Sequence, residues 1–394
     1  MKKNSRILTI LTVLLLLLSV SCTATSSPST VTITSTSMIT SSVTVTTTTS
    51  ITSTNSQVTT STASQSAEFE VIRAAAEAYA KSGKVTEITA KDLYTNLKDG
   101  KPGNDPFIIN VRWDSSELAD IYLLGHIDTS LNVPQDLVFT EQPIMVPRAG
   151  YTEELQAMKI PKTSQVVVVS HNGSVGDQVT ALLNILGYDA VNLKWGMTSW
   201  TKETRVAPGR YNQTETEAYR VDTSPYPLTE TYSLPVIENT TSSDSHEIIR
   251  AAADAYATSG KTVNIISDAL NASLKNHDTS DNPLILCVDD ANTYAKGHVT
   301  QAVNIPFADL FTQANLKKLP ANQKIVVYSY NGHIGSQATA LLNILGYDAV
   351  NLMWGIASWT FDSNVAPDRY NEATDCMGYP YVNGTLPSIY TGYY

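Results

Sequence analysis

The sequence has few cysteines, and this shortage excludes several kinds of site. Its 394 residues contain only Cys22, Cys287 and Cys376. Three thiols are too few for a disulfide-rich scaffold, a four-cysteine zinc site or an ordinary iron–sulfur cluster. The six histidines include no close pair in the sequence, so we expect no metal site, and no motif indicates a cofactor.

Basic residues are scarce as well. The 26 Lys and Arg against 37 Asp and Glu leave a net charge of −11, and this chain's 16% of charged residues is low. The first 22 residues carry three cations and no acid, so the rest of the chain sums to −14. Phosphates and anionic lipids are held by clustered Lys and Arg. We therefore expect no nucleic-acid partner and no electrostatic attachment to a membrane.

The first 22 residues have the order of an export signal. Met1 to Arg6 is basic, Ile7 to Leu18 is a short apolar run, and Ser19-Val20-Ser21-Cys22 follows. This order is typical of a secretory signal peptide, and the run is too short for a transmembrane helix, which needs about 20 apolar residues. Small residues before Cys22 resemble the lipobox of prokaryotic lipoproteins. We expect residues 1–21 to be removed and the exported protein to be anchored to the membrane, on its extracytoplasmic side, through lipidated Cys22. Cleavage without a lipid is the alternative.

Residues 22–66 follow as a segment dominated by Ser and Thr, without charged or aromatic residues. Such a segment buries too little apolar surface to offset the entropy lost on ordering. We expect a disordered spacer that holds the rest of the chain away from the membrane. Pairing of Val31, Ile33, Val43 and Val45 as weak strands is the alternative.

The remainder of the sequence contains the same unit twice. Thr180 to Leu193 is identical to Thr339 to Leu352, and shorter matches lie on both sides. These include Gly125-His126-Ile127 with Gly297-His298-Val299, Leu131-Asn132-Val133-Pro134 with Val303-Asn304-Ile305-Pro306, and Trp195-Gly196 with Trp354-Gly355. The offset falls from 177 to 159 along the chain, so the first copy carries insertions. So long a repeat indicates duplicated domains, which we place at 67–221 and 244–394 with a linker at 222–243.

Each copy alternates strands and helices. Continuous apolar runs of strand length, typical of strands buried on both faces of a parallel sheet, occur twice in each copy. They are residues 107–111 and 166–169 in the first copy, and 284–288 and 325–328 in the second. Gln178 to Leu186 has helical spacing, and Ala-rich helices are expected at Phe69 to Lys81 and Glu247 to Ser259. The pattern predicts an α/β fold with a parallel sheet.

In both copies a buried strand leads into a glycine-bearing loop and then a helix. The loops are Ser170-His171-Asn172-Gly173-Ser174-Val175-Gly176 and Ser329-Tyr330-Asn331-Gly332-His333-Ile334-Gly335. Such a turn gathers backbone N–H groups and the positive end of a helix dipole around one point. It also lies at the carboxyl end of a parallel sheet, the usual ligand face. We therefore predict a small-anion site formed by residues 171–176 and 330–335.

The order of these motifs resembles the rhodanese family of sulfurtransferases over roughly residues 85–212 and 262–371. It runs strand, Gly-His-Ile, Asn-Val-Pro, strand into a six-residue loop, helix, Leu-Gly-Tyr-Asp-Ala-Val and Trp-Gly. The resemblance implies two domains, each a parallel five-stranded sheet flanked by helices. In active members the loop opens with a cysteine that takes sulfane sulfur from thiosulfate or a persulfide and passes it to cyanide or a thiol. The loop commonly closes with an arginine.

This sequence departs from the family pattern at the decisive positions. Ser170 and Ser329 stand where the resemblance places the nucleophilic cysteine, and Val175 and Ile334 stand where it places the arginine. A persulfide requires a sulfur atom on the protein, and a hydroxyl lacks the accessible pKa of a thiol. We therefore expect a non-catalytic binding or scaffold module whose partner is a small anion or a protein.

Two enzymatic alternatives and one structural alternative stay open. One enzyme is a sulfurtransferase that works through another thiol, Cys287 or Cys376. The other is a serine hydrolase in which His171 assists Ser170, although the second copy has Tyr330 at the histidine position. Cys287 also fits a small buried hydrophobe, and after export it could pair with Cys376. The structural alternative is a protein of the cell envelope that only spaces other components.

Overall fold

The computed structural model describes residues 33–39, 43–49, 58–112, 121–133, 138–140, 144–147, 155–212, 216, 218–275 and 282–384. The chain forms two compact units, Met1–Thr59 and Thr60–Tyr394. The expected signal peptide at residues 1–21 and the expected lipidation site at Cys22 lie outside the described residues. None of the described helices is both long enough and apolar enough to span a bilayer.

The expected spacer contains regular structure. Strands β1 (Ile33–Ile39) and β2 (Val43–Thr49) pair in antiparallel fashion, and helix α1 (Val58–Lys81) begins before residue 66. Both strands are rich in Thr, Val and Ile, and β-branched residues favour strands. The structure thus differs from the expected disordered spacer at these residues and follows the alternative of paired strands.

The strands of each copy correspond to the apolar runs of the sequence. The main strands of the first copy are β3 (Glu87–Ile88), β4 (Phe107–Asn110), β5 (Leu131–Asn132), β8 (Gln165–Val169) and β9 (Asp189–Leu193). Those of the second are β11 (Asn264–Ile265), β12 (Leu284–Cys287), β14 (Val303–Asn304), β15 (Lys324–Tyr328) and β16 (Asp348–Leu352). The described residues also form the short strands β6 (Ile144–Pro147), β7 (Leu155–Met158), β10 (Val221–Asp222) and β13 (His298–Val299).

The helices alternate with these strands. In the first copy they are α2 (Ala90–Leu97), η1 (Pro102–Asn104), α3 (Ile121–Leu124), α5 (Ser174–Ile185) and α6 (Gly196–Trp200). In the second they are α7 (Ser245–Ala257), α8 (Ser267–Lys275), α9 (Ala291–Lys296), α10 (Phe307–Leu310), α11 (Gln313–Leu316), α12 (His333–Ile344), η4 (Gly355–Ser358) and α13 (Glu372–Asp375).

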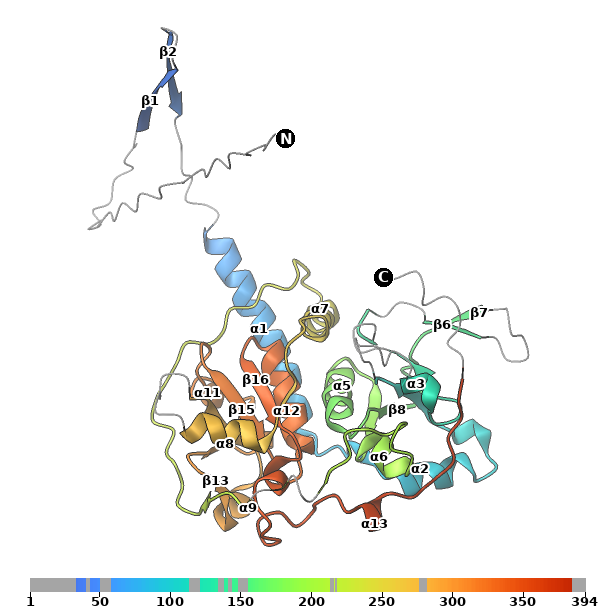
Figure 1. Ribbon diagram of the computed structural model, residues 1–394. Helices are drawn as coiled ribbons and strands as arrows, with labels where there is room; N and C mark the ends of the chain where they lie inside the picture. The colour runs from blue at the N-terminus through green and yellow to red at the C-terminus, as the bar shows by residue number, and fades with distance from the viewer. Residues whose placement is uncertain are drawn as a thin grey trace, which may run out of the picture. The chain divides into compact units, whose positions relative to one another are not determined.

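Each copy is built on one parallel sheet. The strand orders are β3-β9-β8-β4-β5 and β11-β16-β15-β12-β14, and each neighbouring pair is parallel. Helices flank the sheets (Figure 1). The predicted fold class, two α/β domains with five-stranded parallel sheets, is therefore confirmed. The antiparallel pair β6–β7 lies within the stretch where the repeat offset falls, so it belongs to the insertion expected in the first copy.

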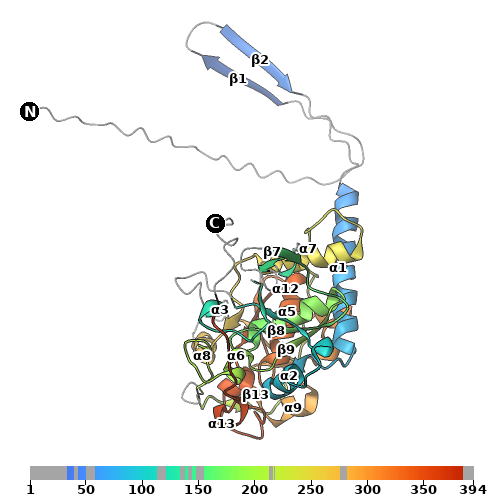
Figure 2. The ribbon, with the colours of Figure 1, turned by 90° about the vertical axis from the view of Figure 1, so that its right-hand side faces the viewer.

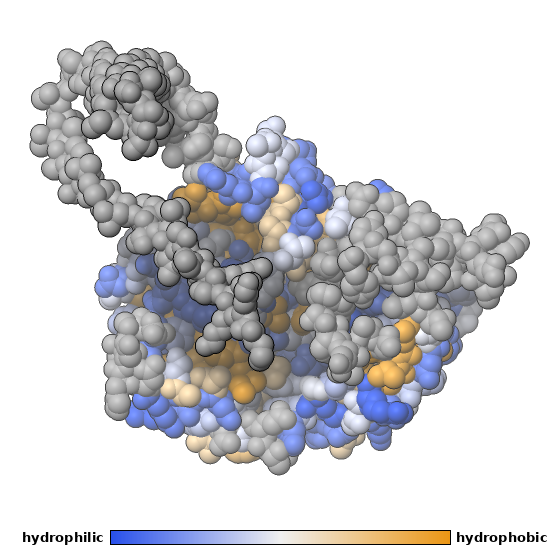
Figure 3. Space-filling view, turned by 45° about the horizontal axis from the view of Figure 1, so that its top comes forward, coloured by the Kyte–Doolittle hydropathy of each residue, from blue (hydrophilic) through white to orange (hydrophobic). Residues whose placement is uncertain are grey.

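A shared hydrophobic core joins the two copies. Helices α5 and α12 lie side by side (Figures 1 and 2), and one buried cluster includes Val166 and Leu182 of the first copy with Ile325 and Leu341 of the second. On the face shown in Figure 3, hydrophobic residues form separate areas among hydrophilic ones. Burial of the apolar faces of the central helices therefore holds the repeats together.

The contacts between the copies are reciprocal. Tyr79 of α1 donates a hydrogen bond to Gln337 of the second copy at 2.8 Å, and Tyr256 of α7 donates one to Gln178 of the first at 2.7 Å. These two pairs are equivalent by the repeat, as expected for a pseudo-two-fold interface. The two Ala-rich opening helices, which the sequence predicted, therefore each bridge to the other copy.

The C-terminal segments of the two copies are exchanged in the same way. At the end of the first copy, the carbonyl of Arg220 accepts from the indole N–H of Trp359 in the second copy, and β10 pairs with β13. Near the end of the second copy, the carbonyl of Pro380 accepts from Trp200 of the first copy, and Val382 pairs with His126. The boundaries proposed from sequence at 221 and 394 therefore do not separate two independent bodies.

Candidate functional site

The two predicted loops occupy the expected position. They join β8 to α5 and β15 to α12, and the helices begin at Ser174 and His333 after Gly173 and Gly332. The parallel strands end at this edge, so the geometry places backbone N–H groups and a helix N-terminus around each loop serine.

The two serine hydroxyls are buried at the centre of their loops. Ser170 Oγ accepts a hydrogen bond from the Gly173 amide at 3.1 Å. Ser329 Oγ accepts from the Gly332 amide at 3.1 Å and from the Gly335 amide at 3.2 Å. The two side chains are 2% and 0% exposed. In both copies the serine oxygen therefore takes donors that a bound anion would otherwise use.

Asparagine side chains take further loop donors. Asn172 Oδ1 accepts from the Ser174 amide at 3.3 Å, and Asn331 Oδ1 accepts from the His333 amide at 3.1 Å. Asn331 also donates to Asp368 at 2.9 Å. Side-chain oxygens of the residues that precede the N-cap glycines thus accept from the first amide of each helix. The predicted anion cradles of residues 171–176 and 330–335 are partly filled by the protein's own groups.

A tryptophan–glycine turn packs against the backbone of each loop serine. The amides of Met197 and Ile356 donate to the carbonyls of Ser170 and Ser329 at 2.9 and 3.0 Å. A Cβ on Gly355 would lie 2.0 Å from the Ser329 carbonyl oxygen, so only glycine fits there. The repeated Trp-Gly motif therefore fixes the loop rather than forming a binding platform.

A cavity of about 220 Å³ opens beside the first loop. Its lining includes Arg112, Ser170, His171 and Val175 from the first copy and Lys261 from the second. Lys261 Nζ donates to Asn343 Oδ1 at 3.0 Å and to a backbone carbonyl at 3.3 Å, and both acceptors are uncharged. The cavity therefore lies beside a lysine that the sequence analysis did not connect with this loop.

Arg112 adds a second cation to this cavity. Its guanidinium donates to Asn110 Oδ1 and to the carbonyls of Val206 and Gly125, which are all neutral acceptors. Burial lowers the pKa of Arg112 to about 9. A buried guanidinium that is solvated by neutral groups creates a positive potential, which favours an anion in the adjoining space.

The second copy has a different chemistry at the equivalent position. Asp289 stands where the first copy has Arg112, and burial raises the pKa of its carboxyl to about 7. Cys287 Sγ lies 3.6 Å from Asp289 Oδ2. Burial raises the pKa of this thiol as well, and the side chain is 2% exposed. Cys287 therefore lacks the lowered pKa and the access that reactive cysteines have. Both Cys287 and Cys376 are free thiols, so the disulfide weighed from the sequence is not formed.

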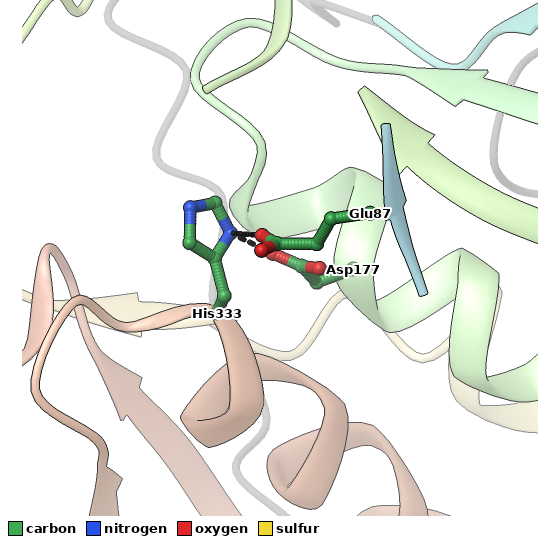
Figure 4. A group of neighbouring side chains, drawn as sticks. All are labelled: Glu87, Asp177 and His333. Atoms are coloured by element: carbon green, nitrogen blue, oxygen red, sulfur yellow. Dashed lines mark hydrogen bonds and ion pairs between the residues drawn. The ribbon is translucent and has the colours of Figure 1, made fainter. Parts of the chain in front are cut away.

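A charged cluster at the contact between the copies was missed by the sequence analysis. It joins Glu87 of β3, Asp177 of α5 and His333 of α12 (Figure 4). His333 Nδ1 lies 2.5 Å from Asp177 Oδ2 and 3.0 Å from Glu87 Oε1. The neighbouring carboxylates raise the pKa of His333 to about 10 against the opposing effect of burial. Burial also raises the pKa of Asp177 to about 6, while His333 lowers that of Glu87.

Only alignment of the two repeats could have revealed this cluster. His333 is equivalent to Ser174, Asp177 to Ser336, and Glu87 to Asn264. The three charged residues are distant in sequence, so they form no motif within one segment of the chain. The signal in the sequence is that a charged residue in one copy is matched by a neutral residue in the other at all three positions.

Comparisons with known proteins agree with this architecture. The family model of the rhodanese-like domain matches residues 89–203 and 270–362, more than half of the chain. The chain therefore belongs to the rhodanese-like domain family, and it contains two such regions. The search of curated protein sequences gives no match.

Several solved structures are also similar. A rhodanese-related protein from Thermoplasma volcanium is 22% identical, with a TM-score of 0.22, and the match covers 31% of this chain and 99% of that one. A rhodanese-like domain protein from Staphylococcus aureus is 26% identical, with a TM-score of 0.23, over 25% of this chain and 91% of that one. A thiosulfate sulfurtransferase from Pseudomonas aeruginosa is 13% identical, with a TM-score of 0.25, over 80% of this chain and 49% of that one.

Proposed function

We propose that this protein is an exported, lipid-anchored tandem rhodanese-like protein that does not transfer sulfur and acts as a binding module for a small anion. One observation carries the proposal: the position of the family nucleophile is a buried serine in both copies, and each hydroxyl accepts amide hydrogen bonds of its own loop. Without a loop thiol, no persulfide forms there. The attachment through Cys22 and the role as a binding module rest on the sequence alone.

The cavity beside Ser170 is the proposed binding site. Arg112 and Lys261 supply positive charge, and the end of α7 and the residues that follow it also line the cavity. An anion bound there would lose its hydration shell and interact instead with the two cations and with the loop residues that line the cavity. The second loop has Asp289 in place of Arg112, so we assign anion binding to the first copy only.

The experiment is a thiosulfate:cyanide sulfurtransferase assay on the protein and on the variants Ser170→Cys and Ser329→Cys. We expect no activity above background for the unchanged protein and a cyanolysable sulfur, one per chain, in Ser170→Cys. Ser329→Cys should gain less, since Asp289 repels the anionic donor. Ser170→Ala is the control that changes the same side chain without adding sulfur.

Two results would contradict the proposal. Sulfurtransferase activity in the unchanged protein that disappears in Cys287→Ser would establish the enzymatic alternative through another thiol. If Ser170→Cys folds and gains no labile sulfur at saturating thiosulfate, the cavity does not accept such an anion.

A further inference from the structure

The charged cluster Glu87–Asp177–His333 is not required for the packing of the two copies. At the equivalent point of the pseudo-two-fold interface, Ser174 Oγ donates to Asn264 Oδ1 at 2.7 Å and lies 2.8 Å from Ser336 Oγ. These three neutral side chains hydrogen-bond to one another and occupy the position that the charged cluster occupies on the other side of the pseudo-two-fold axis. The charges on the other side therefore call for a reason beyond packing, since burying two carboxylates costs desolvation free energy.

The cluster has one proton too few for its oxygens. The single proton on His333 Nδ1 is directed to Asp177 Oδ2 at 2.5 Å. Glu87 Oε1 points at the same nitrogen at 3.0 Å, yet this buried atom receives no hydrogen bond among the described residues. Even with a charged imidazole, one cation faces two carboxylates, and the cluster keeps one negative charge.

Other charges near the cluster do not complete this balance. Lys194 lies close enough to favour the ionised form of Glu87, but its Nζ forms an ion pair with Asp368 at 2.7 Å. Gln337 Nε2 approaches Asp177 Oδ1 at 3.4 Å and carries no charge. The geometry therefore places one nitrogen and two carboxylate oxygens, all within 4.8 Å of one another, around a point of unbalanced negative charge.

We propose that Glu87, Asp177 and His333 bind a divalent transition-metal ion, with Zn²⁺ as the representative. His333 Nδ1, Asp177 Oδ2 and Glu87 Oε1 are the ligands, and the ion replaces the imidazole proton. Two carboxylates, a neutral imidazole and a divalent cation sum to zero charge. Imidazole nitrogen and carboxylate oxygen are both ligand types that zinc takes in proteins.

The surroundings suit such a site. In tetrahedral zinc sites, with ligand bonds of about 2.1 Å, neighbouring ligand atoms are separated by about 3.4 Å. The present separations of 2.5 and 3.0 Å therefore need to widen by less than an ångström, which carboxylate rotation provides. The Glu87 side chain is 28% exposed, so this ligand lies nearest to solvent, whereas the Asp177 and His333 side chains are 0% and 4% exposed.

The second nitrogen of His333 has a place for its proton. Nε2 is buried without a hydrogen-bond partner among the described residues, and His333 lines a cavity of about 10 Å³, the size of one water molecule. Asn351 Oδ1 and Trp354 Nε1, which are buried without hydrogen-bond partners, belong to residues lining the same cavity. A water there accepts from His333 and orients the ring, as outer partners of metal-bound histidines do.

The experiment measures Zn²⁺ binding by the full-length protein, by calorimetry and by the metal retained after gel filtration. We expect one ion per chain. His333→Ser and Glu87→Asn introduce the neutral residues found at the equivalent positions of the repeat, Ser174 and Asn264. Each should weaken Zn²⁺ binding at least about tenfold. His246→Ser, which removes a histidine outside the cluster, is the matched control and should bind as the unchanged protein does.

Glu87→Gln guards against a folding defect, because it keeps the side-chain volume at a partly exposed position. Loss of binding in a folded Glu87→Gln supports the proposal. Saturable binding of one ion that persists unchanged in His333→Ser or in Glu87→Gln would overturn it, and so would an unchanged protein that binds no Zn²⁺. Neither result bears on the sulfurtransferase assay, since the cluster and the anion cavity are separate sites.

Discussion

Replacing Asp289 by Asn should stabilise the protein above neutral pH. Asp289 is a buried carboxyl at the end of β12 and is 9% exposed. Burial, the dominant cause, raises its pKa from 3.8 to about 7. Asparagine has nearly the same shape and no charge, so the variant removes the ionisation and leaves the packing in place.

The size of the effect follows from the two pKa values. At about 1.4 kcal/mol per pKa unit, a rise from 3.8 to about 7 corresponds to a cost of about 4 kcal/mol for ionising Asp289 in the folded state. Below pH 4 both states hold the proton, and this cost is absent. Between pH 4 and 7 the unfolded chain releases the proton while the folded protein retains it, so the free energy of unfolding falls as the pH rises. Above pH 7 the full cost applies.

Urea unfolding of the two proteins at pH 4, 6 and 8, with a reductant present, measures this difference. Asp289→Asn and the unchanged protein should have similar stability at pH 4, and the variant should be more stable by about 4 kcal/mol at pH 8. Asp290→Asn, at the neighbouring capping residue whose pKa is lowered by Thr293, is the control and should be destabilising instead. A variant at position 289 that is no more stable at pH 8 than at pH 4, relative to the unchanged protein, would refute the reasoning.

Two further predictions concern the anion cavity and the export signal. Sulfate should raise the melting temperature of the unchanged protein both through general exclusion from its surface and through the cavity, so Lys261→Ala should reduce the rise. Lys84→Ala, the equivalent change in the other copy where the lysine pairs with Asp189 at 2.6 Å, should keep the full rise, and an equal reduction in both variants would contradict the assignment. Metabolic labelling with palmitate in a bacterial host should mark the protein, and Cys22→Ser should lose both the label and its partitioning into detergent. Label that remains in Cys22→Ser would exclude lipidation at that residue.

Much of the fold could be predicted from the sequence because it depends on local patterns. The apolar run at 166–169 and the helical spacing that follows it are sufficient to predict a buried strand and its helix, and the structure has β8 and α5 there. The insertion within the first copy is visible in the sequence as a change of the repeat offset. The hairpin at β1–β2 was given second place because the segment lacks an apolar face, whereas its β-branched residues favour strands.

The site was only partly accessible to sequence reasoning. The loops lie where the motif predicts them, but the motif does not indicate which group a serine hydroxyl binds. In the structure the Ser170 hydroxyl accepts a hydrogen bond from the amide of Gly173. Lys261 and His333 act on the other copy, so their roles depend on how the two repeats dock. That docking is decided by side chains such as Tyr79 and Gln337, which show no periodic signal of an interface.

Joining two subunits of a symmetric dimer into one polypeptide changes what mutation can do to the contact between them. In a homodimer each substitution appears on both sides of the axis, so a cluster of one His, one Asp and one Glu would bring two histidines and four carboxylates into the same buried surface. Here the serine of one half and the histidine of the other, Ser174 and His333, are encoded separately. A single charged centre on an otherwise two-fold contact is therefore a property that the fused chain can acquire and a homodimer cannot.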